Sequence, residues 1–417
     1  MAQFMHKREI EKGIILGGHE MKIILCCLLL VFSGNVFAQE SSAVDIAVRV
    51  HDGDRFVDTL TLEDFEILEE GKPQKIEALY LVRGRNIIKR QEIQPFEPSV
   101  GRHFYLLFQS VDYDSKFGEA VDHLFKDILR PGDTMTLMTP MKVYSLNEEA
   151  LAKRPAASLS KEMQQILRKD IQRGGGDYRD ILKDLRRLVR SIGGDSGVPN
   201  PDMEGDAFAG GAFGLEMQID RYKQNLMKLE NIRLVDENKM LGFASSLRTL
   251  PGQKIVFFFY QREFRPEISP QAMNQMMSMY QDQPNILSDL QDLFSFYRRE
   301  APFNSRRVAQ AFSDAGLSLN FIFMHKEAQY IFGATMREQS EDIFSIFSDI
   351  ARTTGGLSDM SQNPATSFKK TSGAFEDYYL LYYRPSDPAS AGSFRTVEAR
   401  IPGRDYTVHH RQGYLRK

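Results

Sequence analysis

The pattern of apolar and polar positions is clearest in residues 101–140. Residues 104–108 form a short, continuous apolar run, which is typical of a strand buried on both faces. A polar loop, 109–115, follows. Apolar residues then recur at a three/four spacing, which predicts a helix before a second strand at 134–138. This order predicts a βαβ unit and a parallel sheet, so loop 109–115 lies where such sheets bind ligands, beyond the carboxyl ends of the strands.

The chain downstream repeats this alternation of buried strands and amphipathic helices. Two further apolar runs, at 255–260 and 317–324, predict strands of the parallel kind. The periodic segments between and after them predict helices at 161–171, 178–192, 215–247, 307–315 and 340–351. Residues 193–214 are rich in glycine and are interpreted as a mobile loop, whereas the polar, Met-rich segment 270–300 predicts a helical insertion.

Short strands with polar turns occupy the two ends of the mature chain. Residues 41–95 predict a small β unit, and residues 376–417 predict a second set of strands. Neither set has enough strands to bury a core by itself, so we expect both to pack together into one β-sandwich. The α/β domain, residues 100–375, would then be inserted between its halves.

The amino-acid composition limits the possible classes of protein but does not indicate a particular function. The 53 basic and 56 acidic residues give a net charge of −3, which creates no field favouring nucleic acid or an anionic membrane surface. A hydrophobic content of 42% is ordinary for a globular protein. We therefore expect no nucleic-acid partner and no integral membrane segment in the mature chain.

The N-terminal segment predicts export. Residues 21–38 carry one lysine, an apolar run and small residues before Gln39, as in a secretory signal peptide, and residues 1–20 would be an upstream extension. The apolar run is too short for a membrane anchor. We expect a periplasmic or secreted protein. Both cysteines, Cys26 and Cys27, fall inside the signal, so the mature chain has no disulfide and no thiolate.

Six short segments in a fixed order resemble a known family, the bacterial VWFA-related proteins first noted in acidobacteria, of the von Willebrand factor A superfamily. The segments are TLEDFEILEEGKPQKI at 61–76, LRPGD at 129–133, LPGQKI at 250–255, TGG at 354–356, YLLYYRP at 379–385 and RQGY at 411–414. This resemblance implies an exported protein of the α/β fold class, with a Rossmann-like, doubly wound and mostly parallel sheet.

The resemblance also implies where a metal site would be. Metal-binding members of that superfamily hold a metal ion with an Asp-x-Ser-x-Ser loop, a threonine and a second aspartate. The corresponding positions here hold Gln109, Val111, Tyr113, the Gly176–Asp177 pair and Gln261. Nearly every ligand is replaced. The few oxygen ligands that remain would not compensate a divalent cation for the loss of its hydration shell. We therefore predict a degenerate site, no metal and no cofactor.

No catalytic motif is recognisable in the chain. Its histidines are scattered, and neither a metalloprotease pattern nor a nucleophile elbow is present. We predict a non-enzymatic module that binds a protein partner at the carboxyl end of the sheet. The candidate contact residues are Gln109, Ser110, Asp112, Asp114, Ser115, Asp177 and Gln261. One alternative is a metal-dependent adhesion protein that uses Asp112, Asp114 and Asp177 as substitute ligands, and the other is a hydrolase with an unrecognised site. In the simplest interpretation, Asp112 and Asp114 only cap a helix and lie in a solvated loop.

Overall fold

The structure is a computed structural model. It describes residues 43–193, 212–297, 303–331, 334–386 and 392–416. The chain divides into two units, Met1–Ser42 and Ala43–Lys417, and the described residues all belong to the second. The predicted signal peptide therefore lies outside the described residues, as does most of the predicted loop at 193–214.

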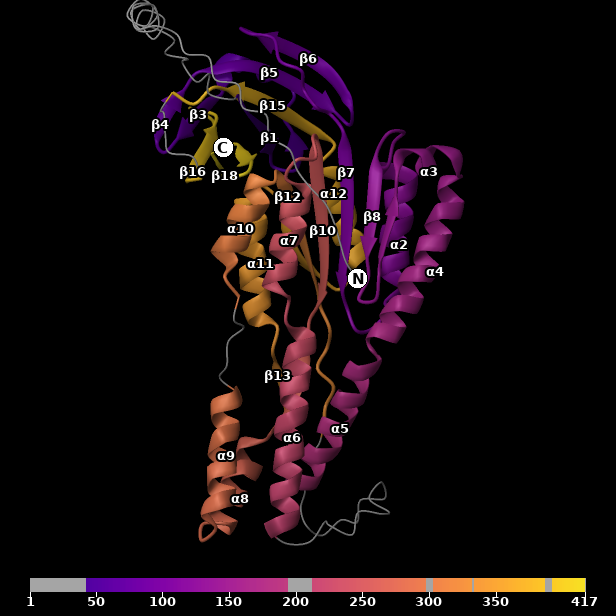
Figure 1. The fold of residues 1–417 in the computed structure, drawn as a ribbon, viewed down its shortest axis with the longest axis vertical. Coiled ribbons are helices and arrows are strands. Elements are labelled where there is room, and N and C mark those ends of the chain that lie inside the picture. Colours follow the sequence, from indigo (N-terminus) through magenta and orange to yellow (C-terminus); the bar gives the residue numbers. More distant parts are fainter. Residues whose placement is uncertain (1–42, 194–211, 298–302, 332–333, 387–391, 417) are drawn as a thin grey trace, which may run out of the picture. The chain divides into compact units, whose positions relative to one another are not determined.

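A six-stranded sheet forms the centre of the α/β part of the chain (Figure 1). Its order across the sheet is β14 (Ser358–Ser361), β12 (Leu317–Met324), β10 (Gln253–Gln261), β7 (Arg102–Gln109), β8 (Thr134–Met138) and β9 (Val143–Leu146). The first five strands are parallel to one another, and β9 is antiparallel to β8. The apolar runs predicted at 104–108, 255–260 and 317–324 lie within β7, β10 and β12.

Helices cover both faces of this sheet, which explains why β7 and β10 are apolar at consecutive positions. On one face, Phe104, Leu106 and Phe108 of β7 enter a core with α2 (Ser115–His123), its π-helical continuation η2 (Leu124–Ile128), α4 (Ala156–Gly174) and α12 (Pro364–Gly373). On the other face, Tyr105 and Leu107 enter a core with α7 (Glu237–Leu247), α10 (Ser305–Asp314) and α11 (Glu341–Thr353). The short helix α3 (Glu148–Lys153) follows β9.

Two antiparallel sheets combine strands from both ends of the described chain. One is strongly curved (Figure 1) and is ordered β17 (Thr407–His409), β1 (Val44–Asp52), β15 (Asp377–Tyr383), β5 (Ile76–Arg83) and β6 (Asn86–Glu92), with β2 (Arg55–Phe56) on β1. The other is ordered β18 (Gly413–Leu415), β16 (Phe394–Arg400), β3 (Glu66–Glu69) and β4 (Lys72–Gln74). Residues of both sheets and of the one-turn helix η1 (Leu62–Asp64) share one apolar core.

A third apolar core belongs to a helical extension. It comprises α5 (Gly176–Gly193), α6 (Ala212–Arg233), α8 (Pro270–Met279) and α9 (Pro284–Tyr297), with the two-stranded ribbon β11 (Phe264–Ile268) and β13 (Ala334–Glu338). The ribbon leaves the sheet just after β10, and α5 follows α4 almost directly. We call this set of elements the helical extension.

The predicted fold class, a Rossmann-like and doubly wound sheet, is wrong. The central sheet is only partly parallel, since the short turn from β8 to β9 can join only antiparallel strands. The other three sheets of the described residues are antiparallel throughout. The fold is instead a mixture of helices with sheets in which antiparallel pairing predominates.

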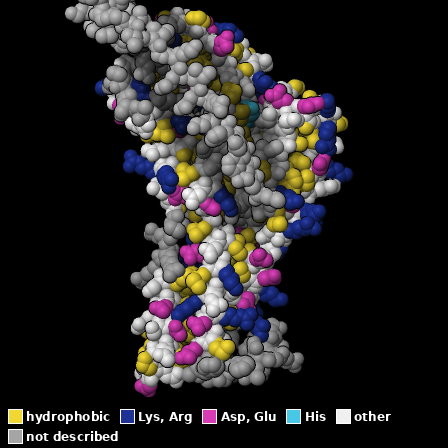
Figure 2. All heavy atoms as spheres, in the orientation of Figure 1, with side chains coloured by type: hydrophobic (Ala, Val, Ile, Leu, Met, Phe, Trp, Pro, Cys, Tyr) yellow, Lys and Arg dark blue, Asp and Glu magenta, His cyan; other side chains and the backbone are white. Residues whose placement is uncertain are grey.

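Two predicted segments also differ from the structure. The single helix expected at 215–247 is two helices, because Asp236 caps a new one, α7, by accepting a hydrogen bond from the backbone N–H of Lys239 at 3.1 Å. Residues 86–92, near the end of the predicted β unit, form an additional strand, β6, which pairs with β5. Acidic and basic side chains are interspersed over the described part of the face shown in Figure 2, in keeping with the near-balanced charge.

Candidate functional site

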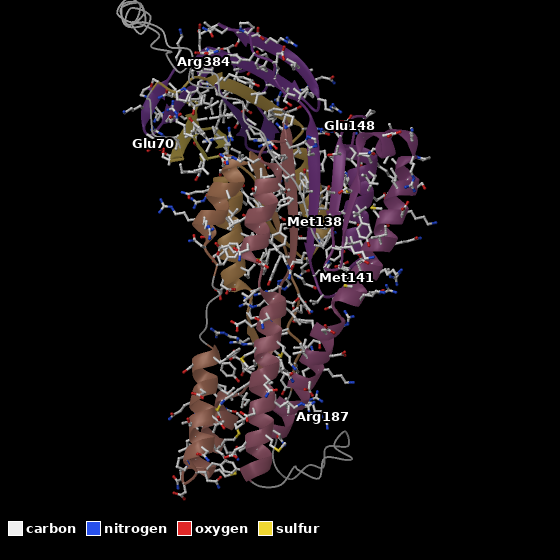
Figure 3. The ribbon with its side chains drawn as sticks, in the orientation of Figure 1. Glu70, Met138, Met141, Glu148, Arg187 and Arg384 are labelled. Atoms are coloured by element: carbon white, nitrogen blue, oxygen red, sulfur yellow. The ribbon has the colours of Figure 1, made fainter. Side chains whose placement is uncertain are left out.

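Three parallel strands end side by side, and polar loops follow each of them. β7, β10 and β12 end at Gln109, Gln261 and Met324, and in the sheet Gln109 is paired with Tyr260 and Gln261 with Met324. In Figure 3, Met141, in the turn after β8, marks this end of the sheet, and Glu148 marks the opposite end. We call it the carboxyl end of the sheet, and it is the place where the sequence predicted a binding site.

Three of the predicted site residues meet in one hydrogen-bonded group. The Ser110 hydroxyl lies 2.7 Å from the Asp112 carbonyl oxygen and 2.9 Å from Gln261 Oε1. The backbone N–H of Asp112 also donates to Gln261 Oε1, at 3.2 Å. Gln261 thus holds the loop after β7 in a turn, which is a structural task that a neutral amide performs without any metal.

A lysine occupies the centre of this end of the sheet. Lys326, two residues beyond β12, places Nζ 2.6 Å from Asp112 Oδ2 and 4.0 Å from Glu263 Oε2. Arg179 of α5 lies on the other side of the same aspartate, with Nη1 3.8 Å from Asp112 Oδ1 and a 2.7 Å hydrogen bond to the Val111 carbonyl. Asp112 is therefore held between two cationic side chains.

Glu263 is the most buried carboxylate of the group, with 4% of its surface exposed. The Tyr178 hydroxyl donates to its Oε2, and the Ser340 hydroxyl accepts from its backbone N–H at 3.1 Å. Burial raises the pKa of Glu263 to about 7, against the opposing effects of Lys326 and the Tyr178 hydrogen bond. Burial and the neighbouring carboxylate likewise raise the pKa of Tyr178 well above its ordinary value.

A second polar group adjoins the first along the same loops. Arg262 donates from Nη1 to His325 Nδ1 at 2.9 Å, and its Nη2 pairs with Glu338 of β13. Because a guanidinium can only donate, Nδ1 of His325 must accept in this arrangement. The group ties the loop after β10 to the loop after β12 and to the ribbon of the helical extension.

The remaining predicted site residues do not join this group. Gln109 donates from Nε2 to the Ile232 carbonyl at 3.2 Å, at the end of α6. Asp114 caps α2 by accepting from the Lys116 N–H at 2.8 Å, which is the simpler role that its sequence position allowed. Ser115 and Asp177 are exposed at the starts of α2 and α5.

The carboxylates offered as substitute metal ligands are not brought together. In the part of the chain that the structure describes, no group of three or more His, Cys, Asp or Glu side chains is arranged to hold a metal ion. Asp112 is paired with Lys326, and Asp114 is engaged at a helix cap. The positive charges beside Asp112 are thus those of two side chains, Lys326 and Arg179.

Sequence reasoning missed the three residues that dominate this site, Lys326, Glu263 and Tyr178. A signal for two of them was available. Lys326 follows the predicted strand at 317–324 by two residues, and Glu263 follows the strand at 255–260 by three. The rule that ligands bind beyond the carboxyl ends of parallel strands applies to those loops as much as to the loop after β7. Tyr178 lies in a helix, and only tertiary packing brings it there.

The helical extension packs directly over this site. Val111 contacts the core of the extension, and a side chain at Gly175 would overlap the Val111 carbonyl oxygen. Ser110 and Glu263 are each 4% exposed as a result. Accessible surface remains at the margin of the site, which we call the rim. The rim consists of Asp112, Asp114, Ser115, Asp177 and Arg179.

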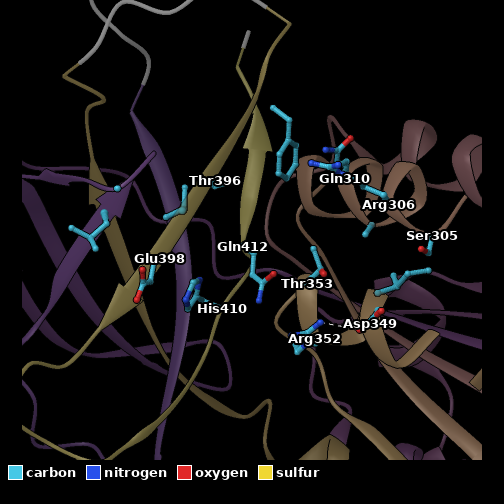
Figure 4. A pocket seen from close by; sticks show the side chains of 16 residues that line it. Ser305, Arg306, Gln310, Asp349, Arg352, Thr353, Thr396, Glu398, His410 and Gln412 are labelled. Atoms are coloured by element: carbon cyan, nitrogen blue, oxygen red, sulfur yellow. Dashed lines mark hydrogen bonds and ion pairs between the residues drawn. The ribbon is translucent and has the colours of Figure 1, made fainter. Parts of the chain in front are cut away.

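A separate cleft of about 600 Å³ lies between α10 and α11 on one side and β16 and the loop before β18 on the other (Figure 4). Arg306 and Gln310 line the helical wall, and Glu398 and His410 line the strand wall. His410 is already engaged, since its Nε2 accepts from the Ala399 N–H at 3.1 Å. Charged side chains therefore line both walls, with Arg306, Arg352 and Asp349 on the helices and Glu398 on the strands.

Comparisons with known proteins do not assign a family. No protein-family model matches the chain, and no curated protein matches it. Among solved structures, the human COPII-coat protein Sec24c matches with a TM-score of 0.31 and 7% sequence identity, over 77% of this chain and 44% of that chain. The chain thus spans less than half the length of that protein, and a likeness this weak supports no conclusion about fold or function.

In the described residues, no helix has the length and apolar character needed to span a bilayer.

Proposed function

We propose that this chain is an exported, non-enzymatic module that binds a protein partner at the rim, without a bridging metal. The observation that carries the proposal is the position of Lys326. Its ammonium lies between Asp112 and Glu263, at the end of the sheet where metal-binding members of the resembled superfamily hold their ion. A fixed cation of this kind could perform the charge-pairing role of a metal with a partner, although it cannot activate water.

The charges of the rim suit a partner that carries a carboxylate. Asp112 is 41% exposed, and Arg179 is 43% exposed beside it, so solvent reaches both. A carboxylate from a partner could take the place of Asp112 beside Lys326 and Arg179. Releasing Asp112 from Arg179 costs little, since ion pairs exposed to this degree contribute only up to about 1 kcal/mol.

Burial of the strongest acid–base pair argues against catalysis. A glutamate whose pKa is near 7, next to a tyrosine and a lysine, is the kind of group that enzymes use. However, Glu263 is 4% exposed and Tyr178 is 1% exposed, so a substrate cannot reach either. The family resemblance, to exported VWFA-related proteins, agrees with a binding role and stays a prediction.

The metal-dependent alternative has less support. It needs Asp112, Asp114 and Asp177 to converge, but Asp112 is paired with Lys326 and Asp114 caps α2. A calorimetric titration of the protein with Mg²⁺, Mn²⁺ and Ca²⁺ after chelator treatment separates the two. The proposal expects no saturable heat with any of them. Saturable binding that is lost in Asp112→Ala would favour the alternative.

Partner capture with rim variants tests the proposal itself. The full chain, Ser115→Glu and Arg179→Glu are immobilised and exposed to the exported proteins of the source organism, since each variant places a negative charge where the partner's carboxylate would bind. Lys153→Glu is the matched control, because Lys153 is 71% exposed on α3, at the opposite end of the sheet. We expect one protein, quantified by mass spectrometry, to be retained by the wild type and the control and lost by both rim variants. Identical retention on all four proteins would contradict the proposal.

A further inference from the structure

A buried arginine lacks a counter-ion at the junction between the curved antiparallel sheet and the central sheet. Arg49 of β1 is 3% exposed, and its guanidinium stacks on the Phe375 ring at 3.8 Å from the ring centroid. Among the described residues, Arg49 forms no ion pair, and its Nε has no hydrogen-bond partner. A guanidinium buried in this way costs several kcal/mol unless a negative charge lies near it.

Other buried polar atoms without partners gather around the same arginine. The Tyr378 hydroxyl is fully buried beside the Gln253 amide, yet it makes no hydrogen bond of normal geometry. Both amide atoms of Gln253, which opens β10, are also buried and unpartnered, as is Nδ1 of His51. Isolated buried polar groups of this kind are rare in proteins, and Arg49, Tyr378 and Gln253 lie together at one junction, so they call for a common explanation. His51 lies farther along β1, against Phe56 and His409.

Two arginines, Arg49 and Arg102, and one aspartate, Asp45, act electrostatically on the buried Tyr378 hydroxyl. Arg102 lies near Tyr378 but is neutralised by its own buried partner, Asp133. Burial lowers the pKa of Arg49 to about 9, which reflects the cost of its uncompensated charge. Burial and the nearby charge of Arg49 also lower the pKa of His51.

From this geometry we infer a binding site for a small monovalent anion, of chloride size, bounded by Arg49, Tyr378 and Gln253. Such an ion accepts hydrogen bonds from Arg49 Nε, from the Tyr378 hydroxyl and from the Gln253 amide nitrogen. A water molecule could accept the same bonds, but it could not compensate the charge of Arg49. The site would join β1 and β15 of the curved sheet to the start of β10 in the central sheet.

Thermal unfolding of the full chain tests this inference. The unfolding midpoint is measured as chloride replaces gluconate, an anion too large for the site, at constant ionic strength. We expect chloride to raise the midpoint saturably, by about 2 °C or more, because a ligand of the native state stabilises it by mass action. Bromide should do the same, and in crystals its anomalous signal should lie within hydrogen-bond distance of Arg49.

Two variants and a control separate a specific ion from a general salt effect. Arg49→Met keeps the packing against Phe375 but removes the charge, and Tyr378→Phe removes one donor. Arg55→Met is the control, since Arg55 is exposed in β2 of the same sheet. We expect the chloride response to vanish in Arg49→Met, to weaken in Tyr378→Phe and to persist in Arg55→Met. An equal response in Arg49→Met and the wild type, or equal midpoints of the wild type in the two salts, would overturn the inference and leave water as the occupant.

Discussion

Lys326 Nζ lies 2.6 Å from Asp112 Oδ2, so the loop after β12 is bound to the loop after β7 by an ion pair. The two residues are 214 positions apart in the chain. The same ammonium is 4.0 Å from the buried Glu263 carboxylate. This single lysine therefore screens two carboxylates from each other at the carboxyl end of the central sheet.

Removal of that ammonium should create a weak metal site. Lys326→Ser would leave Asp112 and Glu263 facing each other, with the Ser110 hydroxyl nearby, and these are oxygen ligands of the kind that Mn²⁺ and Mg²⁺ prefer. We expect calorimetry to show saturable Mn²⁺ binding in the variant, with a dissociation constant on the order of 10⁻⁴ to 10⁻³ M, and none in the wild type. If the two proteins give the same heats, the lysine does not stand in for a cation.

Glu263 should make the protein less stable as the pH rises from about 4.5 to about 7. Its pKa is raised by burial from 4.5 to about 7, so between these values the folded state binds a proton that the unfolded state has lost. Its stabilising contribution is complete below pH 4.5 and is lost as the pH reaches about 7. The total loss is about 3 kcal/mol, at 1.36 kcal/mol per pKa unit.

Urea unfolding at pH 5 and pH 8 measures this effect. Glu263→Gln keeps the shape and an oxygen acceptor for Tyr178 but cannot ionise, so its stability should fall less than that of the wild type between the two pH values. Glu149→Gln, at an exposed position, should follow the wild type. A parallel pH dependence in all three proteins would show that Glu263 does not titrate in this range.

Removing one partner of the fully buried ion pair between Arg102 and Asp133 should strongly destabilise the folded protein. Arg102 donates to both carboxylate oxygens of Asp133 and to the Ile128 carbonyl, and the two side chains are 1% and 0% exposed. Arg102→Met leaves a buried carboxylate without its partner, and we expect a loss of about 3–5 kcal/mol in denaturant unfolding. The double variant Arg102→Met/Asp133→Leu should recover part of this loss. Asp133→Leu is measured alone as well. If the losses in unfolding free energy of Arg102→Met and Asp133→Leu sum to the loss of the double variant, the two residues are not energetically coupled.

Gly356 should tolerate no side chain. A Cβ at this position would overlap the backbone carbonyl of Leu319 in β12, so Gly356→Ala must displace a central strand. We expect a loss of about 3 kcal/mol or more, as for other severe packing defects. Gly373→Ala is the matched control, because nothing lies within 4 Å of the added Cβ at the end of α12. Comparable midpoints for the two variants in thermal unfolding would contradict this packing.

Local patterns in the sequence were sufficient to predict the elements at the centre of the fold. The apolar runs at 104–108, 255–260 and 317–324 are long enough and uniform enough to be recognised as buried strands, and they lie in β7, β10 and β12. The stripe that predicts a helix after loop 109–115 is buried as α2 and η2. Such elements depend on periodicity within about ten residues, which is visible in a single sequence. The same local rule indicated the carboxyl ends of these strands as the candidate site.

Tertiary structure alone decided which strands pair and which charges meet. The predicted fold class failed because strand direction depends on how distant segments pair. β1, for example, lies antiparallel to β15, with Val44 opposite Tyr383. Strand β6 escaped recognition because its exposed edge has no continuous apolar pattern.

Likewise, the composition of the site could be only partly predicted. Ser110 and Asp112 lie in a loop that the sequence indicated and Gln261 ends β10, whereas Lys326 and Tyr178 reach Glu263 only through the packing of β12 and α5. The raised pKa of Glu263 follows from that burial, which no local pattern encodes.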